Sequence, residues 1–380
     1  MKSLHQFIKG ILLVILLSPF LLCSNEKDTL EEYFVVLDYN DTIFLEKKNE
    51  TELIGNYYIR MKNDVIGLLG RDNVNFINPV FRLYDNRGQL IFEKDAYRFK
   101  GRPIAFKDFY TTDDYVYLFA GKLLLKYKWN GELVSTCLLN KKIIRSFPLS
   151  EQFMTYIENE QQFIVNSFPK SNITVKGDEN YYQKSSPIFM LVDSLGLLVK
   201  SFGHYPKEYN VSTNNLSPSI AIGTSKNRIY YVTHTSPDII IYDYTGEYHG
   251  KIEGIHSKNM DYRITPNTKK METIQDAMSR TKEDRINSYN DRYVNFDVLP
   301  NEGYRYYIEN RDTTIRDKIK RNYYVMDFYP KEQKYCEFEI KTDNRIQFLN
   351  HPVKDEIMYY ERTKEKNQIV KVLIKEDIKF

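Results

Sequence analysis

Four times along this chain an apolar run stops at a short Asp/Asn-to-Gly turn, and a second apolar run follows directly. The turns are Asp85–Gly88, Asn130–Gly131, Asp193–Gly196 and Asp243–Gly246. An Asp or Asn side chain accepts hydrogen bonds from backbone N–H groups within its turn, and Gly takes the positive-φ position that strains other residues. Each instance therefore predicts a β-hairpin.

The hairpins recur at intervals of roughly 45–65 residues, which is typical of repeated four-stranded sheets. Grouping the other short apolar runs in the same way gives five complete sets and a sixth that lacks its outermost strand. The N-terminal run Tyr33–Leu37 or Thr42–Leu45 can supply this strand and so cover two exposed sheet edges. We therefore predict an all-β, six-bladed β-propeller over residues 33–380, closed by an N-terminal strand. A two-domain β-sandwich is the competing fold, but such regular hairpins favour radial repetition.

The bounds of individual strands follow from the same apolar runs. In the second set, the innermost strand is predicted at Pro103–Phe109. In the third set, Ile144–Leu149 and Phe153–Ile157 are predicted as the first and second strands. Residues 158–186, which include Phe163–Val165, then form a long interruption before the third strand of that set.

A second long insert, about residues 255–293, separates the fourth set from the fifth. Within it, Thr268–Asn287 spaces apolar residues such as Met271, Ile274 and Met278 among charged ones in the pattern of an amphipathic helix. Such an inserted helix either caps the domain or forms a lid over a site.

Composition agrees with a large β protein and excludes one class of partner. Hydrophobic residues make up 42% of the chain and aromatic residues 14%, with 32 Tyr and 22 Phe against one Trp, which favours strands. The net charge of +3 falls to +1 when residues 1–22 are removed, because they contain two lysines and no acid. A nearly neutral chain gives no electrostatic case for nucleic-acid binding.

The first 22 residues have the pattern of an export signal. Lys2 and Lys9 precede the apolar run Ile11–Leu17, and Pro19 follows it. This run is too short to cross a bilayer, which needs about 20 apolar residues. We therefore expect residues 1–22 to be a signal peptide.

Cys23 stands where a bacterial lipoprotein has its lipid-modified cysteine, and the polar residues after it resemble a tether, assigned to residues 23–32. The residue before such a cysteine is usually small, whereas this chain has Leu22. Lipid attachment at Cys23 is the prediction. An ordinary signal or an uncleaved anchor with an incidental cysteine is the alternative.

Several long connections are expected on one face of the ring. Connections between the second and third strands of each blade share a face with the crossovers to the next blade, and in propellers that face carries most known sites. His204 and His234 fall there in adjacent connections near Asp238, where two imidazoles could bind a metal or transfer a proton. No third ligand stands at a recognisable spacing, so no metal site is predicted. The candidate ligand-binding residues are Arg71, Asp72, His204, Tyr205, His234 and Asp238.

Motifs for catalysis or cofactor binding do not occur in the sequence. It contains no G-x-S-x-G elbow, no phosphate-binding loop and no dinucleotide fingerprint. No catalytic residue and no cofactor are therefore predicted. Cys137 and Cys336 lie far apart in strand-like runs, which predicts free cysteines that pack as small apolar residues.

The segment Leu191–Tyr209, LVDSLGLLVKSFGHYPKEY, carries a resemblance to a known group. Together with the lipoprotein-like start and the Asp-x-x-Gly hairpins, it resembles the large Bacteroidota group of TolB-like six-bladed β-propeller lipoproteins, whose members have an LDSLG…FG-x-YP stretch. The resemblance implies an envelope lipoprotein with a binding or scaffolding role. It carries no catalytic residues to transfer.

Two functions remain open at this point. The first is a non-enzymatic binding or scaffolding propeller, monomeric and lipid-anchored in the cell envelope, that presents its loop-rich face to a glycan, a peptide or an envelope protein. The second is a hydrolase or lyase acting on a polysaccharide or lactone, with His204 or His234 as the acid or base. Bound metal, or a carboxylate beside either imidazole, would favour the second.

Overall fold

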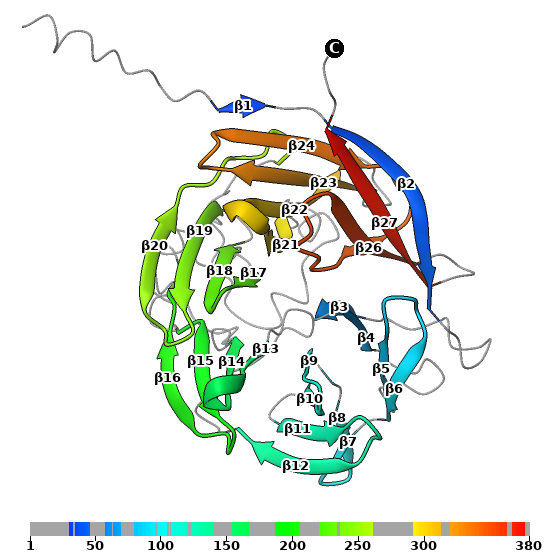
Figure 1. Cartoon of the computed structure of the whole chain (residues 1–380), viewed down its shortest axis with the longest axis vertical. Helices are drawn as coiled ribbons and strands as arrows, with labels where there is room; N and C mark the ends of the chain where they lie inside the picture. The colour runs from blue at the N-terminus through cyan, green and yellow to red at the C-terminus, as the bar shows by residue number, and fades with distance from the viewer. Residues whose placement is uncertain are drawn as a thin grey trace, which may run out of the picture.

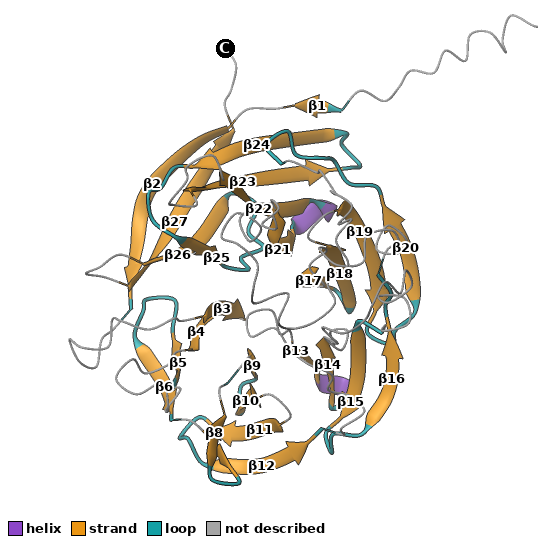
Figure 2. Ribbon diagram, turned by 180° about the vertical axis from the view of Figure 1, so that it is seen from behind, coloured by secondary structure: helices purple, strands orange, loops and turns teal. Residues whose placement is uncertain are grey.

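The chain forms a closed ring of six antiparallel sheets, the blades of a propeller, arranged around a central axis (Figures 1 and 2). This confirms the predicted fold and excludes the two-domain sandwich. The computed structural model describes residues 30–32, 35–45, 58–62, 64–69, 80–95, 97–104, 106, 108–120, 123–139, 154–166, 187–205, 220–233, 236–260, 292–312, 320–362 and 367–376.

The first three blades follow one another along the chain, each as four antiparallel strands from the axis outward. Blade one contains β3 (Tyr58–Lys62), β4 (Val65–Leu69), β5 (Phe81–Tyr84) and β6 (Leu90–Lys94). Blade two contains β9 (Asp108–Thr111), β10 (Tyr115–Ala120), β11 (Leu123–Lys128) and β12 (Leu133–Leu138). Blade three contains β13 (Met154–Ile157), β14 (Gln162–Asn166), β15 (Phe189–Asp193) and β16 (Leu198–Phe202).

The other three blades complete the ring. Blade four contains β17 (Ile220–Ser225), β18 (Arg228–Thr233), β19 (Ser236–Asp243) and β20 (Tyr248–Ile252). Blade five contains β21 (Arg292–Val298), β22 (Tyr304–Asp312), β23 (Lys320–Tyr329) and β24 (Lys334–Ile340). Blade six contains β25 (Ile346–Phe348), β26 (Glu356–Arg362), β27 (Asn367–Glu376) and, as its outermost strand, β2 (Val35–Phe44).

The N-terminal strand closes the ring as predicted. Strand β2 pairs antiparallel with β27, from Val35 opposite Glu376 to Phe44 opposite Gln368. This one ten-residue strand covers parts of both segments that the sequence offered as alternatives. The sequence did not predict β1 (Glu31–Glu32), which lies within the expected tether and pairs in parallel with β24. Blade five therefore has a fifth strand at its rim.

The predicted hairpin turns are confirmed in blades one to four, where each joins the two outer strands. In the first, the Asp85 Oδ1 atom accepts from the N–H groups of Arg87 and Gln89, both at 2.9 Å. Gly88 ends this turn with a φ of 82°, a conformation that a side chain would strain. The turn chemistry read from the sequence is therefore the chemistry that the structure uses.

The hydrophobic core is divided into six clusters, each lying between two neighbouring blades. A blade therefore buries both faces of its sheet; all four residues of β5, for example, are buried, Arg82 among them. Neighbouring blades approach closely, as a Cβ atom on Gly67 of blade one would lie 2.1 Å from the Phe109 ring of blade two. Glycine at position 67 is thus what allows these two blades to pack together.

Two strand predictions were wrong. Phe163–Val165, assigned to the interruption at 158–186, belongs to β14, the second strand of blade three, so Phe153–Ile157 corresponds to the first strand, β13. The side chains of Phe163–Val165 are buried between blades, and this burial favours a strand despite the polar residues on either side. The predicted first strand, Ile144–Leu149, lies outside the described residues.

Blade two also begins later than predicted. Its innermost strand is β9, whereas most of the predicted strand Pro103–Phe109 lies before it. Arg102–Ile104 instead forms β8, which pairs with β7 (Tyr97–Phe99) in a separate two-stranded hairpin before the blade.

Helices are few in the described part of the chain. They are the single-turn 3-10 segments η2 (Glu158–Glu160) and η4 (Pro300–Glu302). The predicted helix at Thr268–Asn287 lies outside the described residues and stays a prediction. Neither described helix has the length and apolar character needed to cross a membrane.

Candidate functional site

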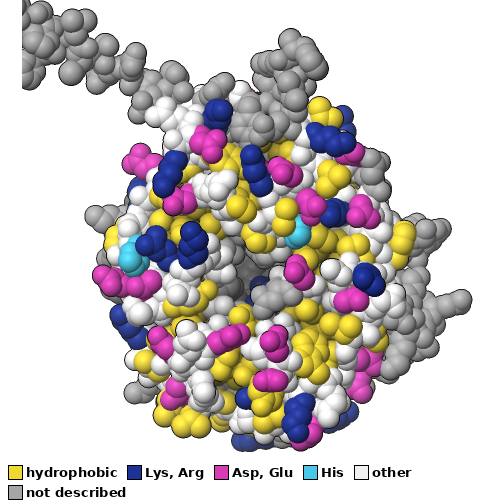
Figure 3. Space-filling model, in the orientation of Figure 1, with side chains coloured by type: hydrophobic (Ala, Val, Ile, Leu, Met, Phe, Trp, Pro, Cys, Tyr) yellow, Lys and Arg dark blue, Asp and Glu magenta, His cyan; other side chains and the backbone are white. Residues whose placement is uncertain are grey.

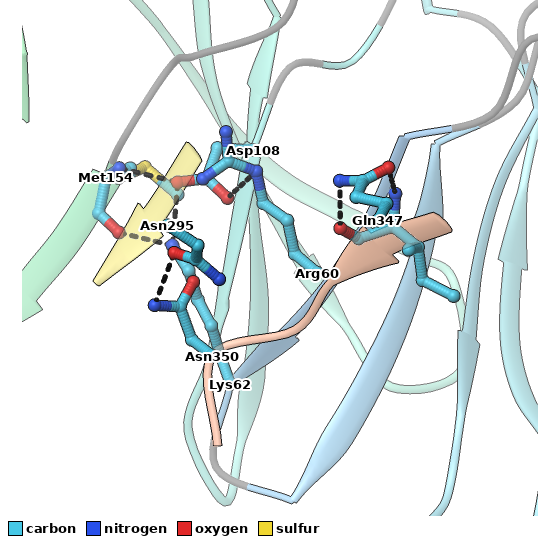
Figure 4. Close-up of polar contacts among 8 residues, drawn as sticks. Arg60, Lys62, Asp108, Met154, Asn295, Gln347 and Asn350 are labelled. Atoms are coloured by element: carbon cyan, nitrogen blue, oxygen red, sulfur yellow. Dashed lines mark hydrogen bonds and ion pairs between the residues drawn. The ribbon is translucent and has the colours of Figure 1, made fainter. Parts of the chain in front are cut away.

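A cluster of charged side chains lies where the innermost strands of blades one, two and three meet (Figure 4). Strand β3 supplies Arg60 and Lys62. Side chains alternate along a strand, and Ile59 and Met61 pack in the core cluster shared with blade six. Arg60 and Lys62 therefore face the other side, toward Asp108 at the start of β9.

The Asp108 carboxylate joins three blades. Its Oδ2 atom accepts from Lys62 Nζ of blade one at 2.6 Å and from the backbone N–H of Met154 in blade three at 2.5 Å. Lys62 Nζ also donates to the carbonyl oxygen of Met154 at 2.6 Å. Figure 4 shows the resulting triangle of contacts. Because Asp108 belongs to blade two, this triangle fixes the inner edges of three consecutive blades against one another.

The same contacts set the electrostatics of the cluster. The Asp108 side chain is 0% exposed, and that of Lys62 is 16% exposed. Burial lowers the pKa of the Lys62 ammonium to about 8, although the Asp108 charge opposes this shift; the positive charge of Arg60 also lowers it. The cost of burying the Lys62 charge is therefore only partly offset by its carboxylate partner.

Arg60 is the residue of this cluster whose N–H donors are not used by described residues. Its Nε atom lies 3.6 Å from Asp108 Oδ1, which is an ion pair but too long for a hydrogen bond. That Oδ1 atom is buried and accepts no hydrogen bond from the described residues. A guanidinium has five N–H donors, and within the described residues Arg60 has only this ion pair. Asp108 thus faces two cations, and its contact with Arg60 is the longer of the two.

Other polar side chains near the axis fasten blades together. Gln347 of β25 donates from Nε2 to the carbonyl of Ile59 at 2.9 Å, and its Oε1 accepts from the Ile59 N–H at 3.4 Å. Asn350 Nδ2 lies within hydrogen-bond distance of Asn295 Oδ1, at 3.0 Å, and of Asp297 Oδ1, at 2.9 Å. These amides link blade six to blades one and five, so their hydrogen bonds serve to hold neighbouring blades together.

A second polar network lies between blades five and six. The Arg305 side chain is wholly buried and forms a two-pronged ion pair with Asp327, at 2.7 Å for both contacts. Arg305 also donates to the carbonyl oxygens of Val353 at 3.0 Å, Lys354 at 2.6 Å and Glu356. It therefore holds the loop between β25 and β26 by its backbone.

The side chains of that loop are also paired. Glu356 binds His351 Nε2 at 2.9 Å and Lys371 Nζ at 2.7 Å. Burial alone would raise the pKa of Glu356, but the hydrogen bonds from Lys371 and His351 outweigh it and lower the pKa. Asp297 has the opposite balance: its burial raises the pKa despite hydrogen bonds from Asn350, the His351 N–H and Tyr307. The contacts of this network therefore serve to hold blade five against the loop between β25 and β26.

The sequence-predicted site residues are not brought together in the described part of the chain. Tyr205 is 3% exposed and packs in the core between blades three and four, which removes it from a solvent-facing site. His204 is exposed, and its carbonyl oxygen accepts from Tyr231 OH at 2.8 Å. Asp238 binds Lys251 Nζ at 2.9 Å and the N–H of Gly254 at 3.3 Å, and no described contact joins it to His204.

The remaining predicted residues, Arg71, Asp72, His234 and the lipidation candidate Cys23, lie outside the described residues. The two other cysteines are described, and neither forms a disulfide. Cys336 is buried, and partial burial raises the pKa of the Cys137 thiol to about 11, which makes it a poor nucleophile. Both cysteines therefore behave as the sequence predicted.

One group of described residues has the composition of a metal site. Asp243, Glu247 and His249 bring one ligand atom each to within 4.8 Å of one another. However, Asp243 Oδ1 already accepts from Thr245 Oγ1 at 2.7 Å and from the Glu247 N–H at 2.9 Å, and its Oδ2 binds His249 at 3.1 Å. The group lies in the hairpin turn of blade four, and turn formation accounts for it.

The central cluster was missed by reading the sequence. Arg60 and Lys62 alternate with apolar residues as in any half-buried strand, and Asp108 is a single acid between Lys107 and Phe109. Lys62 and Asp108 are separated by 46 residues, and Lys62 and Met154 by 92. No local pattern predicts contacts over these distances. The count of blades, which places all first strands at the axis, is the only signal that could have suggested them.

Comparison with known proteins adds evidence on the fold. No family model and no curated protein sequence matches the chain. A solved member of the DUF4221 family from Bacteroides vulgatus is similar, with a TM-score of 0.60 and 12% identity over 92% of this chain and 100% of that one. A candidate exported protein from Bacteroides fragilis has a TM-score of 0.55 and 14% identity over 92% of this chain and 99% of that one. The chain therefore shares its propeller fold with solved structures from Bacteroides.

Proposed function

We propose that this protein is a binding propeller of the cell envelope whose ligand contacts the centre of the ring. The observation that carries the proposal is Arg60, a charged side chain at the axis with hydrogen-bond donors that no described residue uses. Figure 3 shows the molecular surface hollowed at the centre of the ring, with acidic and basic side chains around it. A concave site with a few convergent polar groups is the usual form of a ligand site.

The groups at this centre favour binding over catalysis. A general acid or base needs an oriented partner and access to the substrate. The Lys62 and Asp108 side chains are held by each other and by the backbone of Met154. The alternative hydrolase or lyase would use His204 or His234. The exposed His204 has no carboxylate partner among the described residues, and His234 lies outside them.

Three features support location in the envelope. The first is the signal-like residues 1–22, and the second is Cys23 at the lipidation position. The third is the similar fold of the candidate exported protein from Bacteroides fragilis. Leu30, the first described residue, leads into β1 at the rim of blade five, so a lipid on Cys23 would hold that rim within about 25 Å of a membrane. An anchor at the rim leaves the centre of the ring accessible.

Capture from native envelopes tests the binding role. Wild-type protein, Arg60→Ala and Lys128→Ala are used as baits, and bound proteins and saccharides are identified by mass spectrometry. Lys128 is the matched control because it is a cation at an exposed hairpin, paired with Glu132 at 2.9 Å. We expect Arg60→Ala to lose a ligand that the wild type and Lys128→Ala retain. Equal recovery by all three baits would place the ligand elsewhere, and conversion of the captured ligand by the wild type would show an enzyme.

Membrane fractionation tests the anchor separately. Cys23→Ala should release the protein from the membrane fraction, whereas Cys137→Ala should not, because Cys137 lies within blade two. Continued membrane association of Cys23→Ala would instead show that the N-terminal apolar run is an uncleaved anchor.

A further inference from the structure

We infer that the centre of the ring is a carboxylate-binding site in which Arg60 contacts the ligand directly and the Lys62–Asp108 pair positions Arg60. The inference rests on the proposed binding function and specifies its ligand chemistry. It concerns three residues from two blades, none of which was predicted from the sequence.

The orientation of Arg60 leaves its outer edge free. The Nε atom is the guanidinium nitrogen that faces Asp108, as Figure 4 shows. Within the described residues, no contact occupies the edge formed by the two Nη atoms. That edge presents two parallel N–H groups, the arrangement that a carboxylate accepts as a two-pronged hydrogen bond.

The charge of the cluster favours a ligand with a single negative charge. Asp108 is the acid described beside Arg60, and its other oxygen is engaged by Lys62, so a bound monoanion would balance the Arg60 charge. A phosphate monoester carries up to two negative charges at neutral pH and would leave an excess close to Asp108. Like charges repel strongly where water is partly excluded. The carboxylate is thus the better match.

Asp108 has a definite role in this arrangement. Its Oδ2 atom is fully engaged by Lys62 and Met154, whereas its Oδ1 faces Arg60 at 3.6 Å. The carboxylate therefore holds the Nε side of the guanidinium without a close hydrogen bond. The Arg60 side chain is only 18% exposed, so the ligand would meet a partly desolvated donor, where charge-assisted hydrogen bonds are strong.

Calorimetric titration with small probes tests the inference. D-glucuronate is compared with glucose, and N-acetylglycine with N-acetylglycinamide, so that each pair differs in its carboxylate. Inorganic phosphate is the third anion. We expect at least one carboxylate to bind about tenfold more tightly than its neutral match and than phosphate, and added salt to weaken that binding. The two pairs also distinguish an acidic sugar from a peptide-like carboxylate as the source.

Variants locate the effect. Arg60→Gln should lose about tenfold or more in affinity for the carboxylate, and Arg60→Lys should recover only part of it because an ammonium lacks the planar fork. Lys128→Gln, at the exposed hairpin, should bind as the wild type does. Thermal unfolding of each variant checks the fold, and Arg60 has no described hydrogen bond whose loss would destabilise it.

Three outcomes would overturn the inference: equal binding of acid and neutral probes, full carboxylate affinity in Arg60→Gln, or no binding of either carboxylate up to about 10 mM. Failure of the inference is distinguishable from failure of the proposed function. If Arg60→Ala still loses a native ligand that contains no carboxylate, the binding function stands and only the ligand chemistry is wrong. If capture is also independent of Arg60, both fail.

Discussion

Replacement of Arg305 by alanine should be among the most destabilising single changes in this protein. The Arg305 side chain is wholly buried, and it is the cationic partner of Asp327, whose side chain is 3% exposed. It also donates to the carbonyl oxygens of Val353 and Lys354 in the loop between β25 and β26 and to that of Glu356, the first residue of β26. Arg305→Ala therefore removes the partner of a buried carboxylate and several backbone hydrogen bonds at once.

The size of the effect follows from these contacts. Removing one partner of a buried ion pair costs about 3–5 kcal/mol, because the other charge stays buried. Each carbonyl oxygen left without a donor adds about 1 kcal/mol, less wherever water enters the vacated space. We therefore expect Arg305→Ala to lower the free energy of unfolding by about 5 kcal/mol, a large part of the about 5–15 kcal/mol typical of a folded domain.

Urea unfolding followed by circular dichroism and by tyrosine fluorescence measures this loss, and coincident transitions justify a two-state treatment. The double variant Arg305→Met/Asp327→Leu removes both charges and should be more stable than Arg305→Ala. Lys128→Ala, which breaks an exposed ion pair, should leave the midpoint unchanged. A loss of less than about 1 kcal/mol in Arg305→Ala, or a double variant less stable than the single one, would refute the reasoning.

Three further predictions concern pH and turns. Burial lowers the folded-state pKa of Lys62 from 10.5 to about 8, so the unfolded chain binds more protons than the folded one above pH 8. The wild type should therefore gain stability relative to Lys62→Met by up to about 1.4 kcal/mol per pH unit above pH 8. A difference in urea midpoint between the two proteins that stays constant up to about pH 9.5 would contradict this. Gly196→Ala should lower the melting temperature more than Gly131→Ala. Both glycines have a positive φ, but of the two only Gly196 would place a Cβ against a neighbouring atom, Cys137 Sγ at 2.2 Å. Equal losses in melting temperature would show that this clash has no effect. Asp85→Ala should cost about 1 kcal/mol in urea unfolding by removing the acceptor of its turn, and no loss would show that glycine alone specifies the hairpin.

The features that sequence reading predicted are those with local causes. An Asp-x-x-Gly turn specifies its hairpin through hydrogen bonds within five residues, as Asp85 and Asp193 show. These hairpins, together with the grouping of the other apolar runs, predicted the number of blades and the closing role of the N-terminal strand. By contrast, β14 was missed because only Phe163–Val165 is apolar, and its partners β13 and β15 decide its conformation.

The site residues were harder to predict because their contacts are not local. Tyr205 follows β16 in a segment that resembles a loop, yet its ring is buried in the core between two blades. A tyrosine at a strand end has the same sequence context whether it points inward or outward, and only the neighbouring blade decides between them. Arg60 is the converse case, since a polar residue in an alternating strand has the same sequence pattern whether it faces bulk solvent or, as here, lies near the axis.

Closure of the ring and the central site are physically connected. Gln347 of the last blade binds both backbone groups of Ile59, the residue that precedes Arg60 in the first blade. The backbone at the start of β3 is therefore fixed from one side by blade six, while Asp108 of blade two holds the Arg60 side chain from the other. A guanidinium fixed in this way loses little conformational freedom when a ligand binds, so that more of the interaction energy appears as affinity. The blade that holds Ile59 through Gln347 is the one that the pairing of β2 with β27 completes, so closure of the ring and the preorganisation of Arg60 depend on the same blade.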